Sequence, residues 1–561
     1  GQEWQQRFGQ RRRRSATAAG LGDEFEIEHY LSRQNKVADK DFDPNTMLWI
    51  SKAIDSFTME RPGRDGDPCL VTGLAAARQP ALVIGVQRDV LFPVWQQREV
   101  AEALRAAGNQ HVAYYEMDSV HGHAAFLHDC VSMAPAVRGH LGSTWSSASS
   151  SRASSSSSAS RGRRPLGAPT LSGTKSRQDG TTGAPPKYSV FRLQEPFRLC
   201  SGAELPELHV AYETWGELNE RRDNAILLHG CSPVSSHARS HAGNRARGWW
   251  EDFIGPGRPL NTDRFHIICS NHLGGCHGSS GPSSVDPTDG RRYGSRFPRL
   301  EVQDMVTAQF ALLDHLGIER VHACVGPSLG GMQSLCAAAR HPERVGSFVS
   351  ISACAKSFPG SIAFRHLERQ AIMSQPNWNG GDYYDGQPPL AGLHLARQVG
   401  TITYRSGQEW QQRFGQRRRG AAPTHGLQEE FEIERYLVQQ GKMADKDYDP
   451  NTMLWISKAI DSFNLEQPGK DGQLCLAAGL AAAMQPALVI GVRHDMLFPV
   501  WQQREVAEAL RAAGNQQVAY YELDSVHGHA AFLHDSVSLG PAVKGHLERG
   551  QGRAVARVRK S

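Results

Sequence analysis

The chain lacks three features that would place it in other classes of protein. No apolar run approaches the roughly 18 to 20 residues of a membrane-spanning helix, so we expect a soluble protein with no membrane partner. None of the ten cysteines forms a C-x-x-C pair, so we expect reduced, buried thiols in a cell interior, with no disulfide framework and no metal site. The basic residues are scattered or form short arginine clusters, which does not indicate a nucleic-acid partner.

A long duplication dominates the organisation of the chain. At 561 residues with 39% apolar residues and a net charge of +5, the chain can bury more than one core. Residues 45–50 read Asn-Thr-Met-Leu-Trp-Ile and return as 451–456, and this match continues without gaps at a fixed offset of 406 residues. We therefore interpret residues 1–141 as a partial duplicate of 407–547.

A stretch of biased composition follows the first copy. Residues 142–186 consist mainly of Ser, Arg, Ala, Gly and Pro, with Asp179 as the only acid. Such a segment buries too little apolar surface to offset its ordering entropy, so we expect a disordered linker. Its composition also suits an organelle presequence, which would put the protein in a mitochondrion or plastid instead of the cytoplasm. A presequence in mid-chain would mean that two genes, or two gene models, have been joined. The first residue is Gly1 and not methionine, so we expect a fragment or a processed chain.

Residues 187–549 contain a complete domain in which strands and helices alternate. Apolar strand-like runs at 225–230, 265–270 and 348–353 are separated by glycine-rich loops or by segments with helical spacing. This alternation predicts an α/β fold with a mostly parallel central sheet covered on both faces. Residues of about 357–484 are helical and rich in Trp, Tyr and Arg, which predicts an inserted helical lid, and a basic tail occupies 550–561.

The nucleophile candidate is Ser328. An apolar strand-like run ends at Gly326, the serine comes two residues later, and an alanine-rich helical segment follows Gly330. This G-x-S-x-G pattern between a strand and a helix is typical of a nucleophile elbow, which exposes the serine hydroxyl at a helix N-terminus. We expect the backbone N–H groups of Leu329 and Cys231 to form the oxyanion hole.

A serine nucleophile needs a base, and the base needs an orienting carboxylate. Asp495 and His529 each follow a predicted strand, and they come after the serine in the chain order Ser, Asp, His that this architecture uses. His527 is the alternative base. The first copy contains the equivalents Asp89 and His123 but no elbow, so it could supply the pair only if the chain folded as a circular permutant.

Several longer motifs carry a resemblance to a known family. These motifs are Ala-Tyr-Glu-Thr-Trp-Gly at 211–216, Ser-Ser-His-Ala at 235–238, Gly-Pro-Ser-Ser at 281–284, Gly-Gly-Met-Gln at 330–333 and Thr-Tyr-Arg-Ser at 403–406. Over about residues 187–549 the chain resembles the homoserine O-acetyltransferase family of the α/β-hydrolase superfamily, together with the related fungal-type serine O-acyltransferases.

This resemblance implies acyl transfer from acetyl-CoA or succinyl-CoA, as co-substrate and not as a bound cofactor, to the hydroxyl of homoserine or serine. In the family pattern Ser328, Asp495 and His529 match the catalytic triad. Arg369 matches the arginine that holds the amino-acid carboxylate, and Tyr383 and Tyr384 fall where the family has pocket tyrosines. We also expect a homodimer through the lid.

The chain departs from the family pattern at two positions. Ala530 replaces an aspartate that is expected to meet the substrate's ammonium group, and Pro233 stands in the oxyanion loop. Two other hypotheses therefore stay open, an esterase of the same fold and a degenerate, non-catalytic fusion. The sequence does not decide between acetyl and succinyl donors or between homoserine and serine acceptors.

Overall fold

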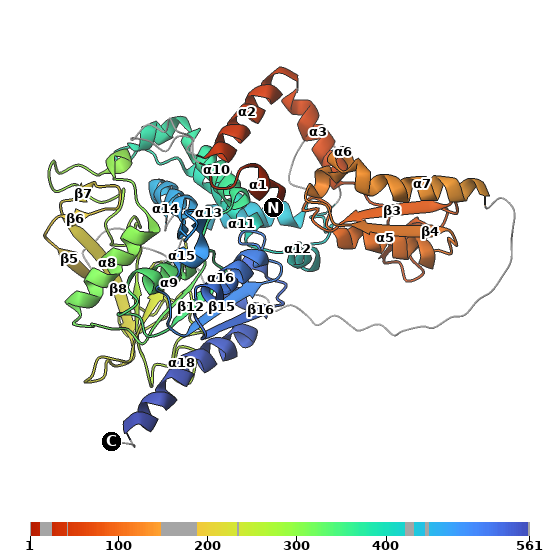
Figure 1. Ribbon diagram of the computed structural model, residues 1–561. Coiled ribbons are helices and arrows are strands. Elements are labelled where there is room, and N and C mark those ends of the chain that lie inside the picture. Colours follow the sequence, from red (N-terminus) through yellow and green to blue (C-terminus); the bar gives the residue numbers. More distant parts are fainter. Residues whose placement is uncertain are drawn as a thin grey trace. The chain divides into compact units, whose positions relative to one another are not determined.

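The structure is a computed structural model, and its parts are labelled in Figure 1. It describes residues 2–11, 25–41, 43–146, 188–232, 235–420, 431–443 and 448–558. Two compact units are present: one combines residues 1–54 with 187–561, and the other spans 55–186. The predicted linker lies outside the described residues from 147 onward, and helix α7 (Cys130–Ser146) covers its start.

The described part of the larger unit is built on an eight-stranded sheet in the order β16-β15-β12-β11-β9-β10-β8-β5. Strands β16 to β10 in this order pair in parallel, and β8 and β5 are added antiparallel at one edge. The strands are β5 (Ser189–Leu193), β8 (Leu208–Trp215), β9 (Ala225–His229), β10 (His266–Ser270), β11 (Ala323–Pro327), β12 (Phe348–Ile351), β15 (Ala487–Val492) and β16 (Val518–Leu523). The predicted mostly parallel sheet is confirmed.

Alternating residues along each strand fill two separate cores, because successive side chains of a strand point to opposite faces. In β9, Leu227 packs into one core and Leu228 into the other. The first core takes helices α8 (Val302–His315), α9 (Leu329–Arg340) and α16 (Val500–Ala512), and the second takes α18 (Ser536–Val558). Strands β9, β11, β12 and β15 are buried on both faces, which explains why their sequences are largely apolar.

A group of helices is inserted between β12 and β15, as the predicted lid requires (Figure 1). It comprises α10 (Pro359–Met373), α11 (Leu390–Thr403), α12 (Gly407–Arg413), α13 (Glu432–Lys442), α14 (Pro450–Ser462) and α15 (Leu476–Gly479). Buried side chains of α14 join the first core, so the lid is packed onto the sheet domain. Among the described residues, no helix combines the length and the apolar character needed to cross a bilayer.

The beginning of the first copy belongs to the larger unit. Helices α1 (Gln2–Arg7), α2 (Glu26–Asp41) and α3 (Pro44–Asp55) repeat the sequences of α12, α13 and α14. Phe8, Phe25 and Ile27 pack against Ile362 and Ala363 of α10. The predicted copy of 1–141 is therefore divided in the structure, since its first 54 residues group with residues 187–561.

The rest of the first copy forms the second unit. Its strands β3 (Ala81–Val86) and β4 (Val112–Met117) pair in parallel with the register of β15 and β16, and α5 (Val94–Ala106) connects them. Shorter elements are β1 (Arg61–Pro62), β2 (Pro68–Cys69), α4 (Leu70–Gly73) and α6 (Ala125–His128). Five of the six residues of β3 are only partly buried, whereas all of β15 is buried. The second unit thus repeats two strands of the large sheet without their neighbours.

Candidate active site

Ser328 occupies a strained turn between β11 and α9. Its backbone has φ 55° and ψ −122°, a conformation that residues other than glycine rarely adopt. The backbone N–H of Ser328 donates to the carbonyl of Ile351 at the end of β12 (2.8 Å), and the Ser328 carbonyl accepts from the N–H of Gly331 (2.9 Å). This is the geometry of the predicted elbow, in which the strand edge fixes the serine at the start of a helix.

The two glycines of the elbow are required by close backbone approach. A Cβ atom on Gly326 would lie 2.3 Å from the carbonyl carbon of Gly330, and one on Gly330 would lie 2.2 Å from the carbonyl oxygen of His229. The turn therefore packs directly on the end of β9. Only residues without a side chain leave room for it.

The structure joins Ser328 to two side chains from the end of the chain. His529 Nε2 lies 2.9 Å from Ser328 Oγ, and His529 Nδ1 lies 2.7 Å from Asp495 Oδ2. The second oxygen of Asp495 accepts the backbone N–H of Phe498 (2.7 Å), which fixes the carboxylate. A carboxylate bonded to Nδ1 holds the imidazole with Nε2 directed at the serine, which suits proton transfer from its hydroxyl.

The alternative candidates are placed elsewhere. His527 forms an ion pair with Glu409 (3.4 Å). In the second unit, His123 Nδ1 lies 2.8 Å from Asp89 Oδ2, so the first copy repeats the pair. The His123 side chain is 41% exposed, compared with 5% for His529. The contact of Ser328 with His529 is the one expected if the chain folds without circular permutation.

A pocket opens beside Ser328 under the lid. The residues that line it are Ser232, Ser328, Arg365, Glu368, Arg397, Tyr404, Tyr448, Met453, Ser457, Ile460, Leu497 and Phe498. Half of them come from α10, α11 and α14, and Tyr404 and Tyr448 lie between these helices, so the lid supplies most of the pocket wall. Cations and an acid beside a nucleophilic serine are suited to a charged, zwitterionic substrate.

The three substrate residues expected from the family pattern do not line this pocket. Arg369 is buried and bonded to Glu28 (2.6 Å) and Asp461 (2.7 Å). The hydroxyls of Tyr383 and Tyr384 donate to Asp449, at 2.6 and 3.2 Å, and Asp449 in turn caps α14. In this structure all three side chains brace the lid, and their role in substrate binding stays a prediction.

Sequence reasoning missed the charged residues that do line the pocket. Arg365 and Glu368 lie on the same face of α10, and Arg397 lies on α11. Arg365 donates through Nε to Asp461 (2.5 Å), but its Nη2 is buried and has no hydrogen-bond partner within the described chain. Burial raises the pKa of Glu368 to about 7, against the opposing charge of Arg365. The spacing of 365, 368 and 369 places these residues on one helix face, but the sequence alone does not distinguish that face from a solvated one.

The residues proposed for the oxyanion hole occupy the expected positions in the chain. Leu329 is the first residue of α9, and Cys231 lies two residues after the last residue of β9. Pro233 lies outside the described residues. Their role in holding an oxyanion stays a prediction.

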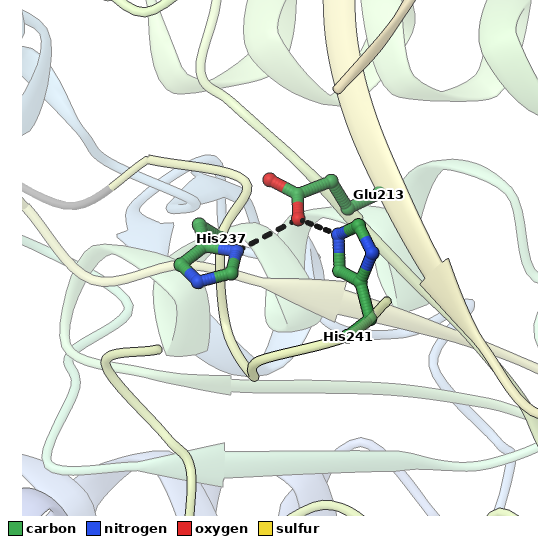
Figure 2. A group of neighbouring side chains, drawn as sticks. All are labelled: Glu213, His237 and His241. Carbon is green, nitrogen blue, oxygen red and sulfur yellow. Dashed lines mark hydrogen bonds and ion pairs between the residues drawn. The ribbon is translucent and has the colours of Figure 1, made fainter. Parts of the chain in front are cut away.

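The loop after β9 is fixed by one buried carboxylate of β8, shown in Figure 2. Glu213 Oε2 accepts from His237 Nδ1 (2.8 Å) and from His241 Nε2 (2.7 Å), and Oε1 accepts from Ser236 (3.2 Å). Two motifs that are separate in the sequence, 211–216 and 235–238, are therefore bonded to each other. This clamp positions the loop that begins with Cys231.

A carboxylate and two imidazoles are also common metal ligands, and these three side chains lie close enough to hold an ion. Their other hydrogen bonds favour the clamp. His241 Nδ1 accepts from the N–H of Gly243, which leaves the proton on Nε2, and His237 Nε2 lies 2.9 Å from the carbonyl of Ala246. Both rings thus direct N–H groups at Glu213.

Comparison with known proteins agrees with this geometry. A family described as alpha/beta hydrolase fold matches residues 225–535. The serine O-succinyltransferase of Emericella nidulans is 45% identical over 65% of this chain and 83% of its own length. The homoserine O-acetyltransferase of Carboxydothermus hydrogenoformans is 42% identical over 63% of this chain and 93% of its own length. Among solved structures, the homoserine O-acetyltransferase of Bacillus anthracis is 25% identical in sequence, and the match covers 64% of this chain and 97% of that protein with a TM-score of 0.59. Esterase E22 is 27% identical, and the match covers 64% of this chain and 99% of the esterase with a TM-score of 0.59.

The fold, the elbow and the family match define an α/β-hydrolase. Within that class, the chain belongs to the homoserine O-acetyltransferase family, which includes serine O-succinyltransferases. It is an acyltransferase enzyme, and the resemblance read from the sequence motifs is confirmed.

Proposed function

We propose that the protein transfers an acyl group from acetyl-CoA or succinyl-CoA to the side-chain hydroxyl of homoserine or serine. The observation that carries this proposal is the hydrogen-bonded chain from Ser328 through His529 to Asp495, at the base of a pocket lined by charged side chains. The names of the relatives support the same reaction class and favour amino-acid biosynthesis.

In the first half-reaction, His529 Nε2 accepts the proton of the Ser328 hydroxyl while Oγ attacks the thioester carbonyl carbon. The carbon–sulfur bond then breaks, His529 returns the proton to the CoA sulfur, and the acyl group stays on Ser328 as an ester. The backbone N–H groups of Leu329 and Cys231 stabilise the negative charge on the carbonyl oxygen. Asp495 holds the His529 ring and stabilises its charged form.

In the second half-reaction, the amino-acid hydroxyl enters after CoA has left. His529 accepts its proton, the hydroxyl oxygen attacks the acyl carbon, and the bond to Ser328 Oγ breaks as His529 returns a proton to that oxygen. Free Ser328 and the O-acyl amino acid result. The lid excludes water, so that transfer competes with hydrolysis.

Two pocket residues are suited to hold the charged groups of the substrate. Arg365 lines the pocket and its Nη2 has no hydrogen-bond partner among the described residues, and a guanidinium binds a carboxylate through charge-assisted hydrogen bonds. Arg365 is better placed for this than the family-based candidate Arg369, whose guanidinium is already bonded to two carboxylates. Glu368 is placed to meet the substrate's ammonium group, in place of the acid missing at Ala530.

The reaction is tested with the purified chain, acetyl-CoA or succinyl-CoA, and either homoserine or serine. We expect CoA release that depends on the amino acid, an O-acyl product of matching mass, and an acyl adduct on Ser328 when the amino acid is omitted. The S328A variant should lose all three signals. CoA release that is the same with and without either amino acid would contradict a transferase.

A second candidate function is ester hydrolysis, favoured by two observations. Esterase E22 has the same fold over nearly its whole length, and Ala530 removes a carboxylate that the transferases of the family are expected to need. Rapid hydrolysis of a simple ester without transfer to an amino acid would support it. A fluorophosphonate probe that labels the parent but not S328A would exclude the third hypothesis, a non-catalytic fusion.

A further inference from the structure

The loop after β16 carries the base of the triad, and residues 404–409 of the lid contact this loop on both sides of the base. Ser406 Oγ donates to the carbonyl of Val526, which precedes the base. The N–H of Ala530, which follows the base, donates to the carbonyl of Tyr404 (2.9 Å). The 404–409 segment therefore holds the backbone before and after the base.

The same segment also contacts the loop between these two hydrogen bonds. The carboxylate of Glu409 forms the ion pair with His527 (3.4 Å). At Gly528 the two backbones lie so close that a Cβ atom would be 2.8 Å from the backbone nitrogen of Ser406, and only glycine leaves room for this approach. The 404–409 segment thus follows the loop closely around the base.

Tyr404 connects these contacts to the substrate pocket. Its ring centroid lies 6.0 Å from that of His529, and its side chain lines the pocket. The guanidinium of Arg397, which also lines the pocket, lies over the Tyr404 ring at 6.0 Å from the centroid. One continuous stretch of the lid, from α11 to α12, therefore forms part of the pocket wall and supports the base.

The two polar side chains of the segment are buried and bonded to each other. Ser406 Oγ accepts the N–H of Glu409 (3.0 Å), which begins α12. The Glu409 carboxylate is bonded to Arg405 and to Arg413 (3.1 Å) as well as to His527. Burial raises the pKa of Glu409, but the interaction with His527 and the charge of Arg405 lower it further, so that it lies below its ordinary value. Glu409 is therefore a fixed negative charge beside the loop.

The second unit contains the same loop but no copy of residues 403–406. Residues 118–124 repeat the sequence of 524–530, whereas Thr-Tyr-Arg-Ser occurs once in the chain. The aspartate–histidine pair forms in both loops, at 2.8 and 2.7 Å. Pairing of the base with its carboxylate is thus a property of the loop and of the strand beside it. The contact of the base with Ser328 is the one for which the loop itself must be held in place.

We propose that Ser406 and Glu409 are positioning residues, which hold the loop so that His529 Nε2 stays within hydrogen-bond distance of Ser328 Oγ. The inference rests on the proposed acyl-transfer function and gives the lid a second role besides the exclusion of water. Catalytic side chains are held within about 0.5 Å of their productive positions by the residues behind them. A displacement of about 1 Å lowers the rate by about 100-fold, so loss of either residue should slow attack by Ser328.

The test in the full chain is the rate at which a fluorophosphonate labels Ser328, because this reaction needs the base but no acyl acceptor. We expect S406A and E409Q to lower the labelling rate, and kcat for CoA release, by about 10- to 100-fold, with KM for both substrates within about twofold of the parent. S406T keeps the hydroxyl and should restore both rates. The matched control is E432Q, which removes a lid carboxylate paired with Arg417 (3.0 Å) and should change neither rate.

The outcomes separate this inference from the proposed function. A parent that the probe does not label would contradict the proposed function itself. A labelled parent whose S406A and E409Q variants react at the parent rate would overturn only the positioning role. Equal losses in S406A and S406T, or a rise in KM as large as the fall in kcat, would also overturn it, because both results mark a general disturbance of the lid. If S406A does not fold, E409Q decides by the same criteria.

Discussion

The ring of Phe498 stacks on the ring of His529, with 5.1 Å between centroids and 24° between planes. The backbone N–H of the same phenylalanine donates to Asp495. One residue therefore restrains both the base and the carboxylate that orients it. The loop after β15 positions the triad by packing as well as by hydrogen bonding.

Removal of the two equivalent histidines should have opposite outcomes. His529→Ala removes the base bonded to Ser328 and should lower kcat by about 10⁴-fold or more. His123→Ala removes the equivalent histidine of the first copy and should leave kcat within about twofold. Steady-state assays of CoA release measure both. Loss of activity in His123→Ala alone would mean that the first copy supplies the base.

Arg365 should control binding of the amino acid. Arg365→Gln removes a charge-assisted hydrogen bond to a carboxylate, so KM for the amino acid, or for succinyl-CoA, should rise by about 10- to 100-fold. The substrate whose KM rises identifies the carboxylate that Arg365 holds. The matched control is Arg504→Gln, which removes an arginine paired with Glu522 away from the pocket. An unchanged KM for both substrates would rule out this role.

Glu368 should give substrate binding a dependence on pH. Burial raises its pKa to about 7, so the carboxyl is protonated below that pH and charged above it. Only the charged form attracts an ammonium group, and KM for the amino acid should therefore fall as pH rises through about 7. Glu368→Gln should remove the pH dependence of KM for the amino acid and should leave the pH dependence of kcat unchanged. A KM profile that is the same in parent and variant would contradict the assignment.

The clamp of Glu213 and His237 should make stability depend on pH. The hydrogen bond to Glu213 raises the pKa of His237 above its ordinary value of 6.5. A histidine whose pKa is higher in the folded than in the unfolded state stabilises the fold. This contribution is fully present at pH values below the pKa of the unfolded state, and it disappears as pH rises through the pKa of the folded state. The Tm difference between the parent and Glu213→Gln should therefore be largest near pH 6 and shrink toward alkaline pH. A difference that grows with pH would contradict a charged His237.

The sheet and the triad could be predicted because their signals are local. The apolar runs of β9 and β15 are buried on both faces, and the order of Ser328, Asp495 and His529 depends only on which strand each follows. The pocket could not be predicted in the same way. The charges of α10 have the pattern of a solvated helix face, and only packing buries them.

The partner of Arg369 was beyond sequence reasoning for a different reason. Glu28 lies 341 positions away, in a copy whose own sequence is nearly that of the segment it packs against. Nothing in either copy distinguishes contacts within a copy from contacts between copies. Only the folded chain makes that distinction.

The elbow should tolerate no side chain at Gly330. An alanine Cβ there would lie 2.2 Å from the carbonyl oxygen of His229, and backbone atoms on both sides would have to move. Gly330→Ala should lower the free energy of unfolding by at least about 2 kcal/mol and displace Ser328. Gly545→Ala is the matched control, because its Cβ meets nothing within 4 Å inside helix α18 and should stabilise the chain by about 0.5 to 1 kcal/mol. Thermal unfolding of both variants measures the contrast, and equal Tm values would mean that β9 and α9 separate easily.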